Sequence, residues 1–151
     1  MPLSRTLLLW LTLATTAFAK PWNGIAPGDS SAEDVTSRFG DPSKTLTAGG
    51  KETLVYSGRE AIQGTVQAQF KLGPEHVVER IDVYPAVVLK VEAIERAYGP
   101  ACDATKSNEP CFVRKETPQK HPYYVYSKLG LAVFFKDDGK TVQSLSFLPG
   151  T

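Results

Sequence analysis

The stretch Leu131–Pro149, LAVFFKDDGKTVQSLSFLP, predicts a strand, a tight turn and a second strand. Its Asp-Gly pair tolerates the positive φ that a hairpin turn requires. A weaker copy of this pattern lies 64 residues earlier, at Gln67–Pro85, QAQFKLGPEHVVERIDVYP. We therefore expect the chain to hold two copies of one hairpin-based unit. The aligned pairs include Ala68 with Ala132, Phe70 with Phe134, Ile81 with Leu145 and Val83 with Phe147.

A short helix is expected ahead of each hairpin. In the first, Val35 and Phe39 recur at helical spacing and Gly40 marks the end. Ser30 and Glu33 predict a capping box, in which the hydroxyl accepts a backbone N–H and the carboxylate reaches back.

In the second helix, Val91, Ile94 and Tyr98 repeat the helical spacing ahead of Gly99. Lys90 stands where a capping serine would be expected. The two patterns share an aromatic residue followed by glycine, which supports a common origin of the two units.

The predicted fold class is α+β. Two tandem units, at about 25–85 and 86–149, would each consist of one helix followed by three antiparallel strands. Together they would form one six-stranded sheet with the helices packed on one face, because a single unit cannot bury its sheet face well. Residues 45–51 are expected to form a loop, and Cys102–Pro122 an insertion present only in the second unit.

Residues 1–19 have the pattern of a secretory signal peptide. Arg5 supplies a positive charge, a short apolar run follows, and Ala17-Phe18-Ala19 fits a cleavage site. We expect cleavage after Ala19, which would leave residues 20–151 as one domain in the periplasm or outside the cell. No cysteine follows the apolar run, so neither a lipid anchor nor membrane insertion after cleavage is expected.

The charge balance argues against a nucleic-acid partner. Residues 20–151 carry 16 basic side chains (17 less Arg5) and 16 acidic ones. Proteins that bind nucleic acid usually carry a strong basic patch, because phosphate contacts dominate their affinity.

Cys102 and Cys111 are the only cysteines. An even count in an exported chain favours a disulfide, and an oxidising compartment maintains it. The alternative is a cysteine nucleophile activated by His121, which requires a free thiolate near a base.

No cofactor, metal site or catalytic group is predicted. His76 and His121 share no ligand spacing, and a zinc site needs three or four ligands at close quarters. Asp137 and Asp138 are explained by the hairpin turn.

The better functional candidate is the face of the sheet that the helices leave open. Tyrosine and arginine on an exposed surface are typical anchors of protein interfaces. The alternative is that these residues pack beneath the long insertion. The predicted surface consists of Val78, Arg80, Asp82, Tyr84, Tyr123 and Phe135.

Several short motifs resemble the SmpA/OmlA (BamE-like) domain. They are Pro27–Ser30, Asp34-Val35, Phe39–Pro42, Leu54–Tyr56 and the hairpin Val133–Val142. The tandem arrangement is similar to the β-lactamase-inhibitor protein family. The resemblance implies a non-catalytic protein that binds other proteins. The chain departs from the lipid-anchored members in having no cysteine for a lipid.

The sequence therefore predicts a secreted or periplasmic protein-binding module that acts through an open sheet face. Its partner would be an envelope protein or an enzyme that it inhibits. A small secreted hydrolase using Cys102–Pro122, with His121 beside Glu116 or Asp103, is the alternative from another class, and a purely structural envelope protein is a third. Pairing across an open strand edge would give a weak homodimer.

Overall fold

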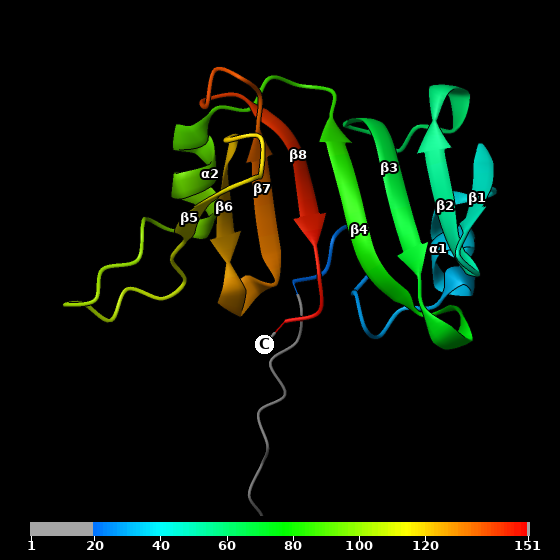
Figure 1. Cartoon of the computed structure of the whole chain (residues 1–151). Coiled ribbons are helices and arrows are strands. Elements are labelled where there is room, and N and C mark those ends of the chain that lie inside the picture. Colours follow the sequence, from blue (N-terminus) through cyan, green and yellow to red (C-terminus); the bar gives the residue numbers. More distant parts are fainter. Residues whose placement is uncertain (1–19, 151) are drawn as a thin grey trace, which may run out of the picture.

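One antiparallel sheet of eight strands makes up most of the protein, with two short helices on one face (Figure 1). The computed structural model describes residues 20–150, so the predicted signal peptide lies outside the described residues. The elements in chain order are α1 (Ala32–Phe39), β1 (Lys44–Ala48), β2 (Lys51–Ser57), β3 (Thr65–Leu72), β4 (Val78–Pro85), α2 (Val91–Tyr98), β5 (Val113–Glu116), β6 (Pro122–Tyr126), β7 (Leu131–Phe135) and β8 (Val142–Phe147). No helix within residues 20–150 is long and apolar enough to cross a membrane.

The strand order is β1-β2-β3-β4-β8-β7-β6-β5. The predicted fold of two units with one helix and three strands each is therefore wrong, because four strands follow each helix and all eight join in one sheet. The missed strands are the two edges, β1 and β5. All their residues are exposed, so neither strand shows the alternation of buried and exposed residues by which a half-buried strand is recognised.

The core lies between the sheet and the helices. The helices contribute the buried side chains of Val35 and Ile94. Two rows of apolar residues, each in register across six strands, face them. The first row is Leu54, Phe70, Ile81, Phe147, Leu131 and Tyr126, and the second is Tyr56, Ala68, Val83, Leu145, Val133 and Tyr124.

Helix α1 begins one residue later than predicted. The capping box is formed by Ser31 and Asp34, since the Ser31 hydroxyl accepts from Asp34 N–H and the Asp34 carboxylate accepts from Ser31 N–H. Ser30 is engaged elsewhere: its hydroxyl accepts from Ala26 N–H and its carbonyl accepts from Val78 N–H. The predicted Ser30–Glu33 box is therefore wrong by one position, because Ser30 joins the helix to β4. Lys90 is the N-cap of α2 and makes no side-chain capping bond, as predicted from the missing serine.

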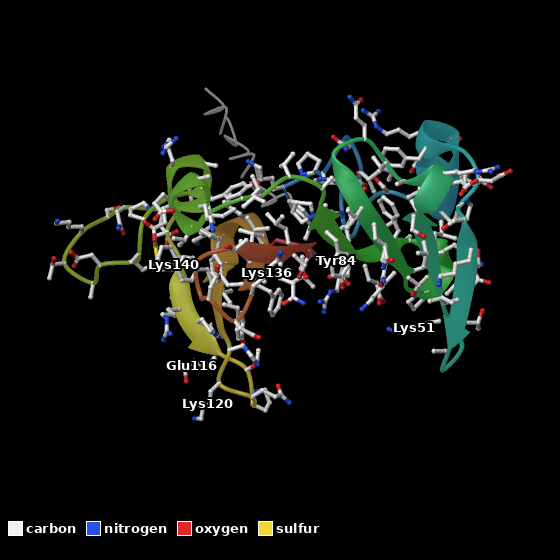
Figure 2. The ribbon with its side chains drawn as sticks, turned by 90° about the horizontal axis from the view of Figure 1, so that it is seen from above. Lys51, Tyr84, Glu116, Lys120, Lys136 and Lys140 are labelled. Atoms are coloured by element: carbon white, nitrogen blue, oxygen red, sulfur yellow. A yellow bond between two sulfur atoms is a disulfide. The ribbon has the colours of Figure 1, made fainter. Side chains whose placement is uncertain are left out.

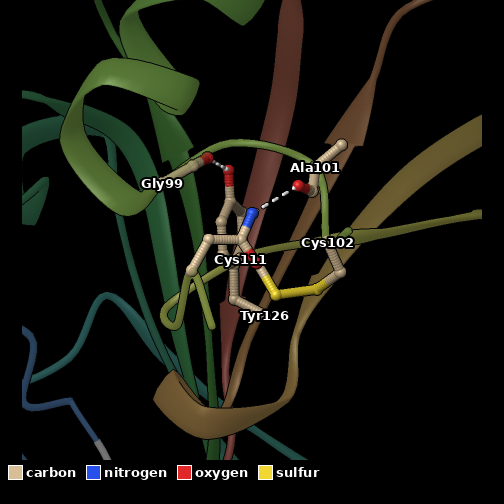
Figure 3. Close-up of a disulfide and its surroundings, with 6 residues drawn as sticks. Gly99, Ala101, Cys102, Cys111 and Tyr126 are labelled. Carbon is tan, nitrogen blue, oxygen red and sulfur yellow. Dashed lines mark hydrogen bonds between the residues drawn. A yellow bond between two sulfur atoms is a disulfide. The ribbon is translucent and has the colours of Figure 1, made fainter. Parts of the chain in front are cut away.

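A buried tyrosine holds the end of each helix on the sheet. The Tyr56 hydroxyl donates to the Gly40 carbonyl at 2.8 Å, and the Tyr126 hydroxyl donates to the Gly99 carbonyl at 2.9 Å (Figure 3). Burial raises the pKa of both tyrosines. Each hydroxyl therefore stays protonated and serves as a donor to an otherwise unpaired helix-end carbonyl.

The predicted disulfide between Cys102 and Cys111 is confirmed (Figure 3). It closes the segment between α2 and β5, which Asn108 also stabilises through a 2.9 Å bond from its side-chain amide to the Ala101 carbonyl. Gly99 has a φ of +118°, and a Cβ there would collide with the Pro110 carbonyl. Glycine is therefore required where the disulfide segment returns to the helix end.

Candidate functional site

The candidate site is the sheet face opposite the helices, which we call the open face. Figure 2 shows both helices on one side of the sheet, with the β1–β2 and β5–β6 hairpins reaching toward the other side and Tyr84 between them. We call the part of the open face between these two hairpins the trough. At its β1–β4 end lies a hollow of about 540 Å³ that includes Lys51, Lys71, Arg80 and the apolar Leu46 and Leu148.

A cluster of charged side chains is fixed at the centre of the trough. The Asp82 carboxylate is nearly buried and accepts from Arg80 Nε at 2.7 Å and from the Ser146 hydroxyl at 2.6 Å. Lys71 Nζ lies 3.2 Å from its other oxygen. Asp82 and Ser146 face each other across β4 and β8. Because a buried charge is costly unless it is paired, this set of contacts holds all four side chains in place.

The trough has more cations than carboxylates. Asp82 is shared by two cations, Lys71 and Arg80, and Lys51 pairs with Glu79 at 3.0 Å. Lys44 and Lys115 are exposed and lie on the two edge strands. The strand register places both side chains on the open face, because Lys44 pairs with Val55 and Lys115 with Tyr123. The set holds five cations (Lys44, Lys51, Lys71, Arg80, Lys115) and three carboxylates (Glu52, Glu79, Asp82), and Glu52 also lies 3.6 Å from His76.

Apolar side chains surround this charged centre. The rings of Tyr123 and Phe134 stack with their centroids 5.0 Å apart, on strands that pair directly. Leu46, Val113 and Leu148 are exposed by 46%, 49% and 37%. The face therefore combines a fixed cation-rich centre with uncovered apolar flanks.

Four of the six residues predicted for the binding surface lie on this face, namely Arg80, Asp82, Tyr84 and Tyr123. Val78 does not, since it is fully buried in the core. The register shifts between Lys71 and Leu72, so that Leu72 pairs with Val78 while Lys71 pairs with Arg80. This shift of register is a β-bulge, in which Glu79 is the extra residue. A bulge moves the side chain before it, here that of Val78, to the other face of the sheet. The placement of Val78 was therefore wrong.

The placement of Phe135 was also wrong. It is buried on the helix side, where its ring meets Tyr124 edge-on at 4.8 Å. Phe134 lies on the open face against Tyr123. The sequence alignment matched Phe134 with Phe70. In the sheet, Phe70 pairs with Leu54, and the residue that pairs in the same way with Tyr124 is Val133. Val133 is therefore the structural counterpart of Phe70. A shift of one residue exchanges the two faces of a strand.

The histidine cluster required by the hydrolase alternative is not formed by the described residues. His121 is about half exposed and its Nδ1 lies 3.3 Å from Asp137, in the turn of the next hairpin. Glu116 pairs instead with Arg114, and Asp103 with Lys106. The two cysteines are bonded to each other, so neither is a free thiolate.

Asp138 serves the hairpin turn. Its carboxylate accepts from the Thr141 hydroxyl and from the backbone N–H groups of Lys140 and Thr141. These bonds, above all the one from the Thr141 side chain, hold the pKa of Asp138 well below its usual range. The predicted turn role of the Asp137-Asp138 pair is consistent with these contacts.

By fold, the chain is an eight-stranded antiparallel sheet with two helices on one face. No protein-family model and no curated protein matches it. It is similar to the crystal structure of a DUF4309 family protein, YjgB, from Bacillus subtilis subsp. subtilis str. 168, with a TM-score of 0.58 and 15% identity over 83% of this chain and 82% of that one. This likeness shows the fold alone. The resemblance to the SmpA/OmlA domain stays a prediction.

A weaker likeness extends to a cysteine-rich secretory protein, SAV1118, from Staphylococcus aureus subsp. aureus Mu50. The TM-score is 0.44 and the identity 12%, over 87% of this chain and 47% of that one. The chain thus matches about half the length of that protein.

Proposed function

We propose that this is an exported protein-binding module whose open face takes a partner protein with acidic and apolar side chains. The observation that carries the proposal is the fixed Lys71–Asp82–Arg80 cluster, with its surplus positive charge, beside apolar side chains that no segment of residues 20–150 covers. The pattern at residues 1–19 and the Cys102–Cys111 disulfide support export to an oxidising compartment.

The arrangement favours a protein partner for a physical reason. Arg80 is already held by Asp82 and Ser146, so less side-chain freedom is lost when a partner docks. Complementary charge speeds encounter and suppresses wrong partners, while buried aromatic and aliphatic anchors contribute most of the affinity. Tyr84, Tyr123 and Phe134 would provide such anchors along the trough.

The test is capture of a partner from extracts of the secreting cells on the immobilised protein. The open-face variants are Leu46→Glu and Val113→Glu, because both positions are exposed and a substitution there leaves the core intact. The matched control is Val88→Glu, at a valine that is 73% exposed and lies in the loop between β4 and α2.

We expect the wild type and Val88→Glu to retain the same protein, and both open-face variants to lose it. We also expect capture to weaken as salt is raised, since exposed charges are screened. Equal capture by all four proteins would show that the partner does not bind through the open face.

A further inference from the structure

The helix side of the sheet has a second feature, which is independent of the open face. Helices α1 and α2 cover the two ends of the sheet, and the central strands β4 and β8 lie between them (Figure 1). A groove of about 470 Å³ is open above these strands. Its floor is formed by core residues, including Val83, Leu145 and Phe147, and its walls by Trp22 and the α2 residues Ala93, Ile94, Ala97 and Tyr98.

The lining of this groove contains no charged residue, although 22% of the chain is charged. Its one buried hydroxyl, Thr65, already donates to the Ile62 carbonyl at 2.7 Å. The Tyr98 hydroxyl is the other side-chain hydroxyl in the lining, and most of the remaining lining side chains are apolar. The groove has the size of a small-molecule site, for which cavities of about 300–1,000 Å³ are usual.

The mouth of the groove is polar. Asn23 and Gln63 are exposed there, and both also line an adjoining hollow that holds Arg38 and Glu60. The Arg38 guanidinium lies over Gly24 and has no ion-pair partner among residues 20–150. The site therefore joins an uncharged apolar channel to two amide donors, the Arg38 cation and the Glu60 carboxylate, and neither charged group has an ion-pair partner among residues 20–150.

We propose that this groove binds a single-chain amphiphile of the fatty-acid type. The alkyl tail lies between the α2 wall and the floor formed by Val83, Leu145 and Phe147. The carboxylate head lies at the mouth, where it accepts from the amides of Asn23 and Gln63 and faces Arg38. The exposed Val87, on the rim of the groove, extends the apolar wall outward.

The experiment is equilibrium dialysis of the purified protein with octanoate, decanoate and decanol. We expect saturable binding of one molecule, with affinity rising about fourfold for each added methylene, because each buried methylene contributes a constant transfer term. Decanoate should bind more tightly than decanol, and Arg38→Gln should remove that difference.

The variant Ala97→Phe fills the groove from an exposed position on α2, and should weaken decanoate binding by at least about tenfold. Ala104→Phe places the same ring on the exposed disulfide segment and should bind as the wild type does. Either of two results would overturn the proposal: decanoate binding that Ala97→Phe leaves unchanged, or equal affinity of the wild type for decanoate and decanol. Unaltered thermal unfolding of both alanine variants would establish that folding is intact.

Discussion

The two halves of the sheet hold their helices in place by different contacts. In the first half, α1 is held by the Ser31–Asp34 capping box and by a cluster of aromatic rings. In the second half, α2 has no side-chain cap, and the Cys102–Cys111 disulfide closes the segment that follows it. Both helices nevertheless end on the same contact, a tyrosine hydroxyl donating to a glycine carbonyl.

The difference shows where each half obtains its stability. The rings of Trp22, Phe39, Tyr56 and Phe70 lie with centroids 5.6–6.0 Å apart around the first helix. In the second half, Phe112, directly after the disulfide, stacks on Tyr124 at 3.7 Å. The second half also has a cluster of rings, with centroids 3.7–5.9 Å apart, formed by Tyr98, Phe112, Tyr124, Tyr126 and Phe135. We infer that the first half relies on packing and a helix cap, whereas the second adds a covalent link that brings Phe112 into its cluster.

The largest expected effect comes from removing the central ring of the first half. Phe70→Ala should lower the free energy of unfolding by about 3–5 kcal/mol, because the cavity adds to the lost burial. Val133→Ala, at the corresponding place in the second half, removes less volume and should cost clearly less. Chemical denaturation of both variants measures the two values, and equal losses would contradict the contrast between the halves.

Removing the disulfide should have the next largest effect. A Cys102→Ser, Cys111→Ser double variant should lose about 2.5–3 kcal/mol, the chain-entropy value for a loop of about ten residues. Hydrogen exchange should accelerate more in α2 and β5, next to the disulfide, than in α1. Acceleration spread evenly over both helices would show that the link does not act locally.

The tyrosine contacts should matter equally in the two halves. Tyr56→Phe and Tyr126→Phe should each cost about 1 kcal/mol, because each leaves a helix-end carbonyl without its donor. Since burial raises the pKa of both hydroxyls, their contribution is fully present below the unfolded pKa of about 10 and is lost as the pH rises above it. Each variant should therefore flatten the alkaline loss of stability measured by thermal unfolding. A variant that unfolds with the wild-type pH dependence would rule out this role.

The smallest expected effect concerns the helix caps. Ser31→Ala should cost about 1 kcal/mol, the usual value of an N-cap hydroxyl. Lys90→Ala should cost less than half as much, because Lys90 makes no capping bond and loses only its contact with Thr141. The denaturation midpoints of the two variants measure both losses of stability. A larger loss for Lys90→Ala than for Ser31→Ala would show that the Ser31 cap is not the stronger contact.

The sequence predicted the inner strands, both helices and the disulfide, because each of these has a local signal in periodicity, capping or cysteine count. It did not predict β1 and β5, whose residues are all exposed. Gly49-Gly50 lies between Thr45 and Thr47 on one side and Thr53–Tyr56 on the other, and this is a hairpin signal that could have revealed β1. The short β5, Val113–Glu116, offers no comparable signal.

The candidate site was predicted in part. Arg80, Asp82, Tyr84 and Tyr123 follow from simple alternation along their strands. The bulge at Glu79 misplaced Val78, and a bulge depends on the pairing of two strands rather than on one segment. The same holds for the Asp82–Ser146 contact, which joins residues 64 positions apart.

The most direct test of the central claim is site-specific photo-crosslinking in the secreting cell. A photoreactive phenylalanine analogue is placed at Tyr84, in the trough, and at Val88, outside it. The account predicts that the Tyr84 position forms a discrete adduct with a partner protein, that Arg80→Ala reduces this adduct, and that Val88 forms none. An adduct at Val88 but not at Tyr84 would contradict the claim that the open face is the binding surface.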